Sequence, residues 1–182
     1  MSQPNFRTAA FATALLLTPT LCFGQDVLGT LNASLDGAER TWFLTAEGAE
    51  SQSFGMTMAI ANLQSFSLWG QPTEKTVNTL NDTLLLKFDV MSVADQVIPL
   101  NVSLTFLADG WKSGWLAGEA DKITFTLTTL EKAEDGVRVE GNYAATASFS
   151  EALSSGEVDA SRTMQINGSF SATLPNSIIQ ER

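Results

Sequence analysis

The segments VRVEGNYAATASFS, residues 137–150, and RTMQINGSFSATLP, residues 162–175, decide the fold class of this chain. Apolar and polar residues alternate in both, which is the pattern of β-strands with one face buried and the other in water. A short motif in which glycine begins a run of small and apolar residues also recurs three times, at Gly29, Gly141 and Gly168. We therefore expect the chain to be built from half-buried strands, with related strands near its two ends.

The repeated glycines suggest how these strands are arranged. Glycine weakens the interior of a strand unless something needs the space, and a neighbouring aromatic side chain such as Tyr143 or Phe170 could lie over the bare backbone. On this hypothesis the first strand and the last two are near neighbours, and the sheet closes through its termini. The alternative is chance similarity between strands rich in glycine, alanine, serine and threonine.

The rest of the chain repeats the alternating pattern, with turn signals about every ten residues. Segment 53–61 also fits a helical stripe, but its neighbours favour a strand. The connections are short and polar, which disfavours parallel crossovers. We predict an all-β fold, a single antiparallel β-sandwich or partly closed barrel of about nine strands with little helix. The seven further predicted strands are 27–35, 40–45, 53–61, 63–69, 83–91, 97–107 and 122–130.

Residues 1–24 are predicted to be a secretory signal peptide. Arg7 precedes an apolar run, Ala9–Leu17, that is too short to span a bilayer, and small residues precede a cut after Gly24. Lipidation at Cys22 is the first alternative, and a retained membrane anchor is the second. We expect residues 25–175 to form one antiparallel β domain, residues 176–182 to form a polar tail, and the mature protein to be periplasmic or secreted without a membrane span.

The composition excludes several classes of chemistry. The chain has no histidine, and its one cysteine lies in the predicted leader. The mature protein would therefore lack the Ser-His dyad, a thiolate nucleophile and the commonest zinc ligands. The net charge of the full chain, −10, should repel nucleic acid. The acidic residues form no metal-binding motif, so we expect neither a metal nor another cofactor.

The best candidate site is Asp109–Gly118, within the segment Asp109–Asp121 that we predict to be a loop rich in glycine and tryptophan. Its residues Trp111 and Trp115, with Lys112 between them, could stack on a sugar ring or stand at the mouth of an apolar pocket. The alternative is that the two indoles fold inward and plug the open end of the sandwich. Trp42 and Trp69 would line a groove or internal pocket if they share a face, although ordinary packing is the simpler interpretation.

The sequence alone favours a non-enzymatic module that binds an unidentified small molecule or protein partner. The first alternative is a carrier that encloses a lipid-like ligand, as closed antiparallel sheets allow. The second is a carboxylate-based hydrolase that uses strand residues such as Asp89 and Glu140. Both acids alternate with apolar residues, so we expect them on the solvent face rather than in a cleft.

Overall fold

The computed structural model describes residues 25–58, 62–94, 96–118 and 122–181, so the predicted leader, with Cys22, lies outside the described residues. The described chain is almost entirely β-structure and contains only two short 3₁₀ turns, η2 (Leu153–Ser155) and η3 (Asn176–Ile178). The strands are β1 (Gln25–Leu35), β2 (Ala38–Glu47), β3 (Phe54–Met58), β4 (Leu63–Gln71), β5 (Thr83–Val93), β6 (Gln96–Trp111), β7 (Ser113–Ala117), β8 (Ile123–Lys132), β9 (Gly136–Ser150), β10 (Asp159–Pro175) and β11 (Ile179–Glu181).

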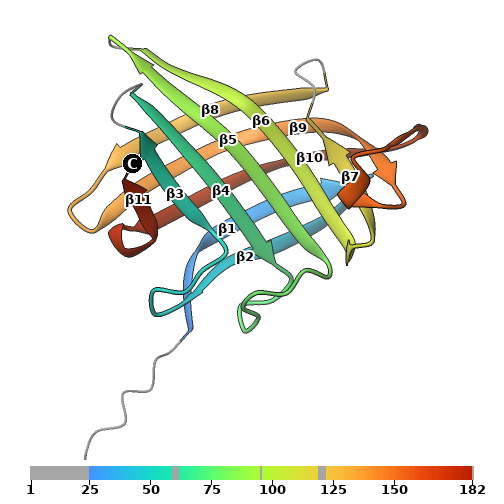
Figure 1. Ribbon diagram of the computed structural model, residues 1–182, viewed down its shortest axis with the longest axis horizontal. Helices are drawn as coiled ribbons and strands as arrows, with labels where there is room; N and C mark the ends of the chain where they lie inside the picture. The colour runs from blue at the N-terminus through green and yellow to red at the C-terminus, as the bar shows by residue number, and fades with distance from the viewer. Residues whose placement is uncertain (1–24, 59–61, 95, 119–121, 182) are drawn as a thin grey trace, which may run out of the picture.

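These strands form one sheet that folds over on itself. Its order is β11-β3-β4-β2-β1-β10-β9-β7-β6-β5, β4 also pairs with β5, and β8 pairs with β9 beside this path. In Figure 1 the strands β3, β4, β5 and β6 lie in front of a second layer made of β1, β2, β8, β9 and β10, and the two layers cross at an angle. Nearly all pairs are antiparallel, and the ring-like sheet confirms the prediction of an all-β sandwich or partly closed barrel.

Strands β1, β10 and β9, which carry the repeated glycine motif, lie next to one another in the sheet, as the motif predicts. Strand β10 lies between β1 and β9, with Gly168 opposite both Ala33 and Tyr143, and with Phe170 opposite Gly141. A Cβ atom at Gly168 would lie 2.8 Å from the Tyr143 hydroxyl oxygen. The aromatic side chains therefore occupy the space that the glycines leave open.

The two layers enclose a core of aromatic and aliphatic side chains. Phe88 lies in the middle of it, with its ring centroid 5.1 Å from Phe66, 4.9 Å from Phe125 and 5.5 Å from Phe170. Trp42 is fully buried and meets Phe106 edge to face. The space between the layers is thus filled by side chains of both.

A bulge in β6 makes one detail of the strand prediction wrong. Alternation predicts that Ile98, Leu100, Val102, Leu104 and Phe106 share one face. The register instead slips between the pairs Lys87–Ser103 and Asp89–Leu100, and Asn101 has a φ of 50°. The one extra residue in β6 reverses the alternation, which turns Ile98 and Leu100 to the outer face, because a one-residue shift moves side chains to the opposite side.

The segment expected to be a loop from Asp109 is largely a hairpin of β6 and β7. The Lys112 backbone N–H donates to the Asp109 carbonyl at 3.1 Å, which closes a tight turn. Gly110 has a φ of 56°, a value that favours glycine at the first central position of such a turn. The prediction of an open loop is therefore wrong for residues 109–117, while residues 119–121 lie outside the described part.

Residues 176–182 are predicted to be a polar tail, but residues 176–178 form η3 and residues 179–181 join the sheet. After η3, strand β11 pairs in parallel with β3, with Ile179 opposite Gly55. Ile178 is buried and packs with the main core. Ile178 and Ile179 hold this segment against the core. Because their neighbours in the sequence are polar, the segment has no strand-like alternation that would have predicted this.

Candidate functional site

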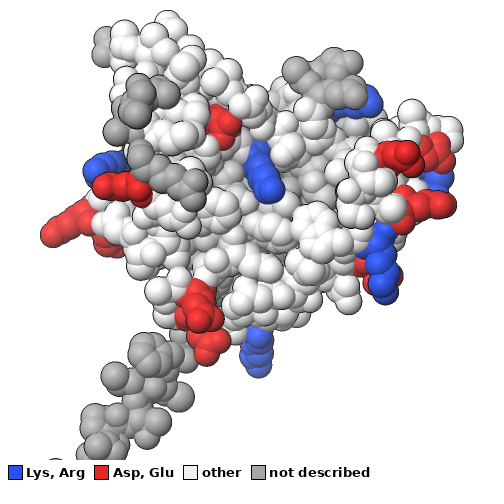
Figure 2. All heavy atoms as spheres, in the orientation of Figure 1, with Lys and Arg blue, Asp and Glu red and all other residues white. Residues whose placement is uncertain are grey.

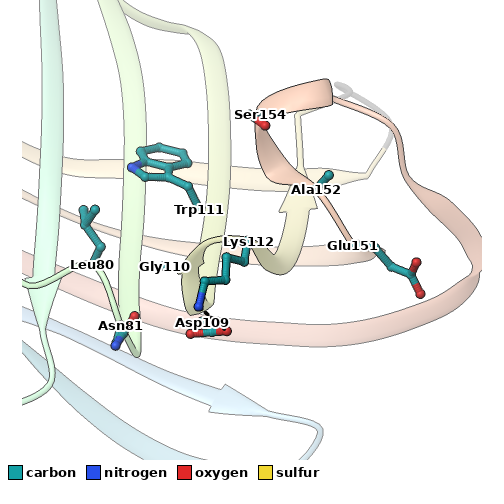
Figure 3. Close-up of a pocket in the computed structure, with 9 residues that line it drawn as sticks. All are labelled: Leu80, Asn81, Asp109, Gly110, Trp111, Lys112, Glu151, Ala152 and Ser154. Carbon is teal, nitrogen blue, oxygen red and sulfur yellow. Dashed lines mark hydrogen bonds and ion pairs between the residues drawn. The ribbon is translucent and has the colours of Figure 1, made fainter.

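A hollow of about 540 Å³ opens where β6 ends and turns into β7. Three segments far apart in the sequence line it: the approach to β5, the turn between β6 and β7, and the chain after β9 (Figure 3). Its lining residues are Leu80, Asn81, Asp109, Gly110, Trp111, Lys112, Glu151, Ala152 and Ser154.

Trp111 is the largest side chain in this hollow, and 45% of its surface is exposed. The tight turn at Gly110 places it at the very end of β6, and its indole meets the indole of Trp69 on β4 at a centroid distance of 6.1 Å. Trp69 is itself held by a hydrogen bond of 3.0 Å from its Nε1 to Ser67 Oγ. Because β5 lies between β4 and β6, the two indoles form an aromatic ledge across β5, on the outer face of the front layer.

Polar side chains lie around the aromatic ledge formed by Trp69 and Trp111. Lys112 Nζ lies 3.5 Å from Asp109 Oδ2, and both side chains are largely in solvent (Figure 3). A Cβ atom at Gly110 would come within 3.2 Å of Asn81 Oδ1, so the glycine also lets the loop before β5 approach the turn. Glu151, on the other side of the hollow, lies 3.9 Å from Arg162. The site thus combines an exposed aromatic surface with hydrogen-bond donors and acceptors of both charges.

The structure separates the two tryptophans that the sequence places in one loop. Trp115 lies on β7 opposite Phe106, where it is partly buried against the main core. It meets Phe149 edge to face at 5.1 Å, and Arg162 covers the Phe149 ring at 3.5 Å. Trp115 therefore points inward and helps to close this end of the sandwich, whereas Trp111 remains on the outside.

Trp42 and Trp69 do not share a face. The Trp42 indole lies in the core and donates a hydrogen bond of 2.9 Å to the carbonyl of Asp82. Arg40 stacks over the Trp42 ring at 4.7 Å and forms an ion pair with the Asp82 carboxylate. Of the five residues that the sequence suggests for binding, the structure brings together Trp111, Lys112 and Trp69, and places Trp42 and Trp115 elsewhere.

The sequence reasoning included Asp109 in the candidate segment but missed Asn81, Glu151 and Ser154 in the hollow. The Asp-Gly pair at residues 109–110 is a turn signal that indicates the turn on which Asp109 lies. Nothing in the local sequence indicates that residues 81 and 151, which are separated by several strands, would meet beside it. Their meeting depends on the pairing of β7 with both β6 and β9.

The two strand carboxylates considered for hydrolysis lie on the outer faces of different layers. Asp89 accepts a hydrogen bond of 2.8 Å from Asn101 on the front layer. Glu140, on the back layer, accepts one of 2.7 Å from Arg138, and hydrogen bonds from Arg138, Ser171 and Thr129 lower the pKa of its carboxyl. A lowered pKa favours the charged form, the opposite of what a general acid requires.

Within the described ranges, no cluster of three or more acidic or other ligating side chains is placed to hold a metal ion. In the same part of the chain, no helix has the length and apolar character needed to cross a membrane. Neither a protein-family model, nor a curated protein, nor a solved structure matches this chain.

Proposed function

We propose that this protein is an exported, non-enzymatic binding module that holds a sugar-like ring against Trp111. The observation that carries the proposal is the exposed indole of Trp111, which is fixed against Trp69 at the edge of a hollow of about 540 Å³. An aromatic ring of this kind offers a large, rigid apolar contact at a small cost in conformational entropy. Such a rigid surface suits the apolar face of a ring-shaped ligand.

The groups around Trp111 favour a sugar over a purely apolar ligand. Asn81, Asp109, Lys112, Glu151 and Ser154 supply amide, carboxylate, ammonium and hydroxyl groups around the hollow. A sugar presents hydroxyl groups at its edge that pair with such side chains, while its ring face packs on an indole. A wholly apolar ligand would leave these polar groups without partners and lose free energy.

The carrier alternative ranks second because the space between the two layers is occupied. Phe66, Phe88, Phe125 and Phe170 pack ring to ring there. A lipid-like ligand would have to displace part of this close-packed core, which is costly in a folded protein. The hydrolase ranks third because Asp89 and Glu140 lie on different layers.

Export remains part of the proposal and rests on the leader in residues 1–24. The acidic composition and the absence of cysteine after the leader suit a soluble envelope protein that is stabilised by its core alone. Mass spectrometry of the protein isolated from its host envelope would report the cut site and any lipid attached to Cys22. A mature chain beginning elsewhere than at Gln25 or Cys22 would contradict this part of the proposal.

Binding can be tested by titrating the mature protein with cellobiose, maltotetraose and N,N′-diacetylchitobiose while tryptophan fluorescence is recorded. At least one probe should give a saturable change, and W111A should bind it about tenfold or more weakly, the loss expected from removing an aromatic contact. The control is V27A, since Val27 is 47% exposed, close to the 45% of Trp111, and lies at the start of β1. Equal affinity in W111A and the wild type, or no saturable change with any probe, would contradict sugar binding at this hollow.

A further inference from the structure

The two layers of the sandwich do not end at the same place. The back layer ends at β8, which pairs with β9 on one edge and has no strand paired to its other edge among the described residues. The hairpin of β5 and β6 in the front layer continues past β8, at the upper left of Figure 1. The front layer is therefore longer than the layer behind it.

The hairpin leaves part of its core-facing side bare. Val90 of β5 is fully buried in the main core, and its cross-strand partner is Pro99 of β6. Side chains two residues apart share a face, so Val97, two residues before Pro99, also points to the core side. Val97 is nevertheless 48% exposed. A side chain on the inner face of a sandwich is exposed in this way when no strand lies opposite it.

A groove runs along this place. Its volume is about 430 Å³, and it separates β6, which contributes residues 99–102, from β8, which contributes Ile123 and Phe125. Val102, Ile123 and Phe125 are partly buried and pack against the main core. The groove is therefore an open continuation of the core between two strands that do not pair with each other.

The first part of β8, from Ile123 to Leu127, lacks the usual protection of an exposed edge, whereas a bulge at Leu127–Thr129 and the charged residues Glu131 and Lys132 lie in its second part. Natural edge strands are commonly blocked by charged residues, proline or bulges. From Ile123 to Leu130 the sequence is ITFTLTTL, with no charged residue and no proline, and the bulge lies only at Leu127–Thr129. Among the described residues, no strand pairs with the outer edge of the first part of β8, so its backbone there can pair with another extended chain.

We infer that β8, Val97 and the groove between them form an acceptor site for one extended strand of a partner polypeptide. The incoming strand would pair its backbone with β8, which extends the back layer by one strand. Its inward side chains would cover Val97 and fill the groove beside Phe125. This is strand addition, in which backbone hydrogen bonds give affinity and alternate side chains give specificity.

The charges of the protein indicate what the partner strand looks like. The chain has a net charge of −10, whereas residues 123–130 of β8 are uncharged. In Figure 2 the described surface over the ends of β5 and β6 is mainly uncharged. The favoured partner segment therefore alternates apolar with small polar residues and contains no acidic residue, because an acidic strand would be repelled.

This acceptor site is separate from the hollow at Trp111. The two lie at opposite ends of β6, which runs from Gln96 to Trp111. The proposal therefore stands independently of sugar binding, and W111A should bind a partner strand as the wild type does.

The test uses the labelled peptide KITFTLTTLK, which copies residues 123–130 and has the required alternation, and the peptide KIFTTTLLTK, which has the same composition without it. Binding is measured by fluorescence anisotropy with the mature protein, V97D and V93D. Val93 is the matched control, since it is 49% exposed on the same hairpin but pairs with Gln96, on the opposite face from Val97. Hydrogen exchange of the wild-type protein, with and without the peptide, reports on β8 without any substitution.

We expect KITFTLTTLK to bind the wild type and V93D alike, V97D to bind at least tenfold more weakly, and the peptide to slow exchange of β8 amides. Equal binding by V97D and V93D, equal binding of the two peptides, or unchanged exchange in β8 would overturn the proposal. A dimer in native mass spectrometry that V97D dissociates would assign the site to a second copy of this chain, and would also overturn it.

Discussion

Phe170 of β10 lies directly opposite Gly141 of β9, and its ring fills the place where a side chain at position 141 would begin. A Cβ atom built on Gly141 would lie 2.7 Å from Phe170 Cε1 and 2.3 Å from the backbone oxygen of Thr126. Both distances are shorter than a carbon atom can tolerate. The glycine therefore lets three strands, β8, β9 and β10, pack together around one aromatic ring.

G141A should destabilise the fold because the methyl group must displace Phe170 or the backbone of β8. The expected loss in the free energy of unfolding is about 3 kcal/mol, at the upper end of the usual cost of overpacking. Urea unfolding measures it. G118A is the control, since the nearest atom to a Cβ at Gly118 is 4.0 Å away. A loss in G141A no larger than in G118A would show that the strands shift apart easily.

Tyr143, the single tyrosine of the chain, should stay protonated well above its ordinary pKa of 10.0 while the protein is folded. Burial raises its pKa because the charged phenolate would lose its hydration, and the hydroxyl also donates to the Asn32 carbonyl at 3.2 Å. A pKa that is raised in the folded state makes stability fall once the pH exceeds the unfolded value, so the loss begins above about pH 10.

Two measurements check this prediction. Tyrosinate absorbance should remain low in the folded protein above pH 10 and should rise when urea unfolds it at the same pH. Y143F should lose about 1 kcal/mol of stability at pH 7, the usual value of one hydrogen bond, and should show a weaker decline above pH 10. A normal tyrosinate titration in the folded protein would mean that the ring is open to solvent.

The bulge at Asn101 should depend on the ability of asparagine to adopt a positive φ. Asn101 has a φ of 50° and donates to Asp89 Oδ2. N101A should cost about 1–2 kcal/mol, because alanine strains this backbone conformation and loses the hydrogen bond, whereas N101G should cost less since glycine adopts it freely. Thermal unfolding ranks the two variants. If N101G is the less stable, the side-chain hydrogen bond matters more than the backbone strain.

Trp111 should account for most of the tryptophan emission that a neutral quencher reaches. It is 45% exposed, whereas Trp42 is fully buried and Trp115 packs against the core. W111F should therefore lower the fraction of emission accessible to acrylamide, and W115F should leave that fraction nearly unchanged. Acrylamide is preferred to iodide because the protein is strongly acidic and would repel an anion. A larger loss of acrylamide-accessible emission in W115F than in W111F would contradict the finding that Trp111 faces outward and Trp115 faces inward.

Local alternation was enough to predict most of the strands. Segments such as 27–35, 83–91 and 137–150 have a clear period of two, and each is a strand in the structure. The shared glycine motif also predicted that strands from both ends of the chain would be neighbours, because glycine and an aromatic ring fit together only when they face each other. Both inferences depend on patterns that are fully present in the residues themselves.

Other features could not be predicted because they depend on residues that are distant in the sequence. The bulge at Asn101 arises from the pairing of β5 with β6, and it reverses the face of Ile98. Strand β11 forms because its backbone pairs with β3, with Ile179 opposite Gly55, which is far away in the sequence. No local pattern specifies which partner a strand will find or where its register will slip.

Some features of the candidate site are likewise set by the residue types alone, and others only by the tertiary structure. The sequence by itself determined that the chain has no histidine and therefore no imidazole for acid–base chemistry, because residue types set the available chemistry. Only the tertiary structure decided that Trp111 faces outward beside Trp69 while Trp115 faces inward, because the turn at Gly110 and the pairing of β7 with β9 fix those directions. Likewise, only the tertiary structure decided that β8 has a paired strand on one edge alone among the described residues, because strand pairing depends on segments distant in the sequence.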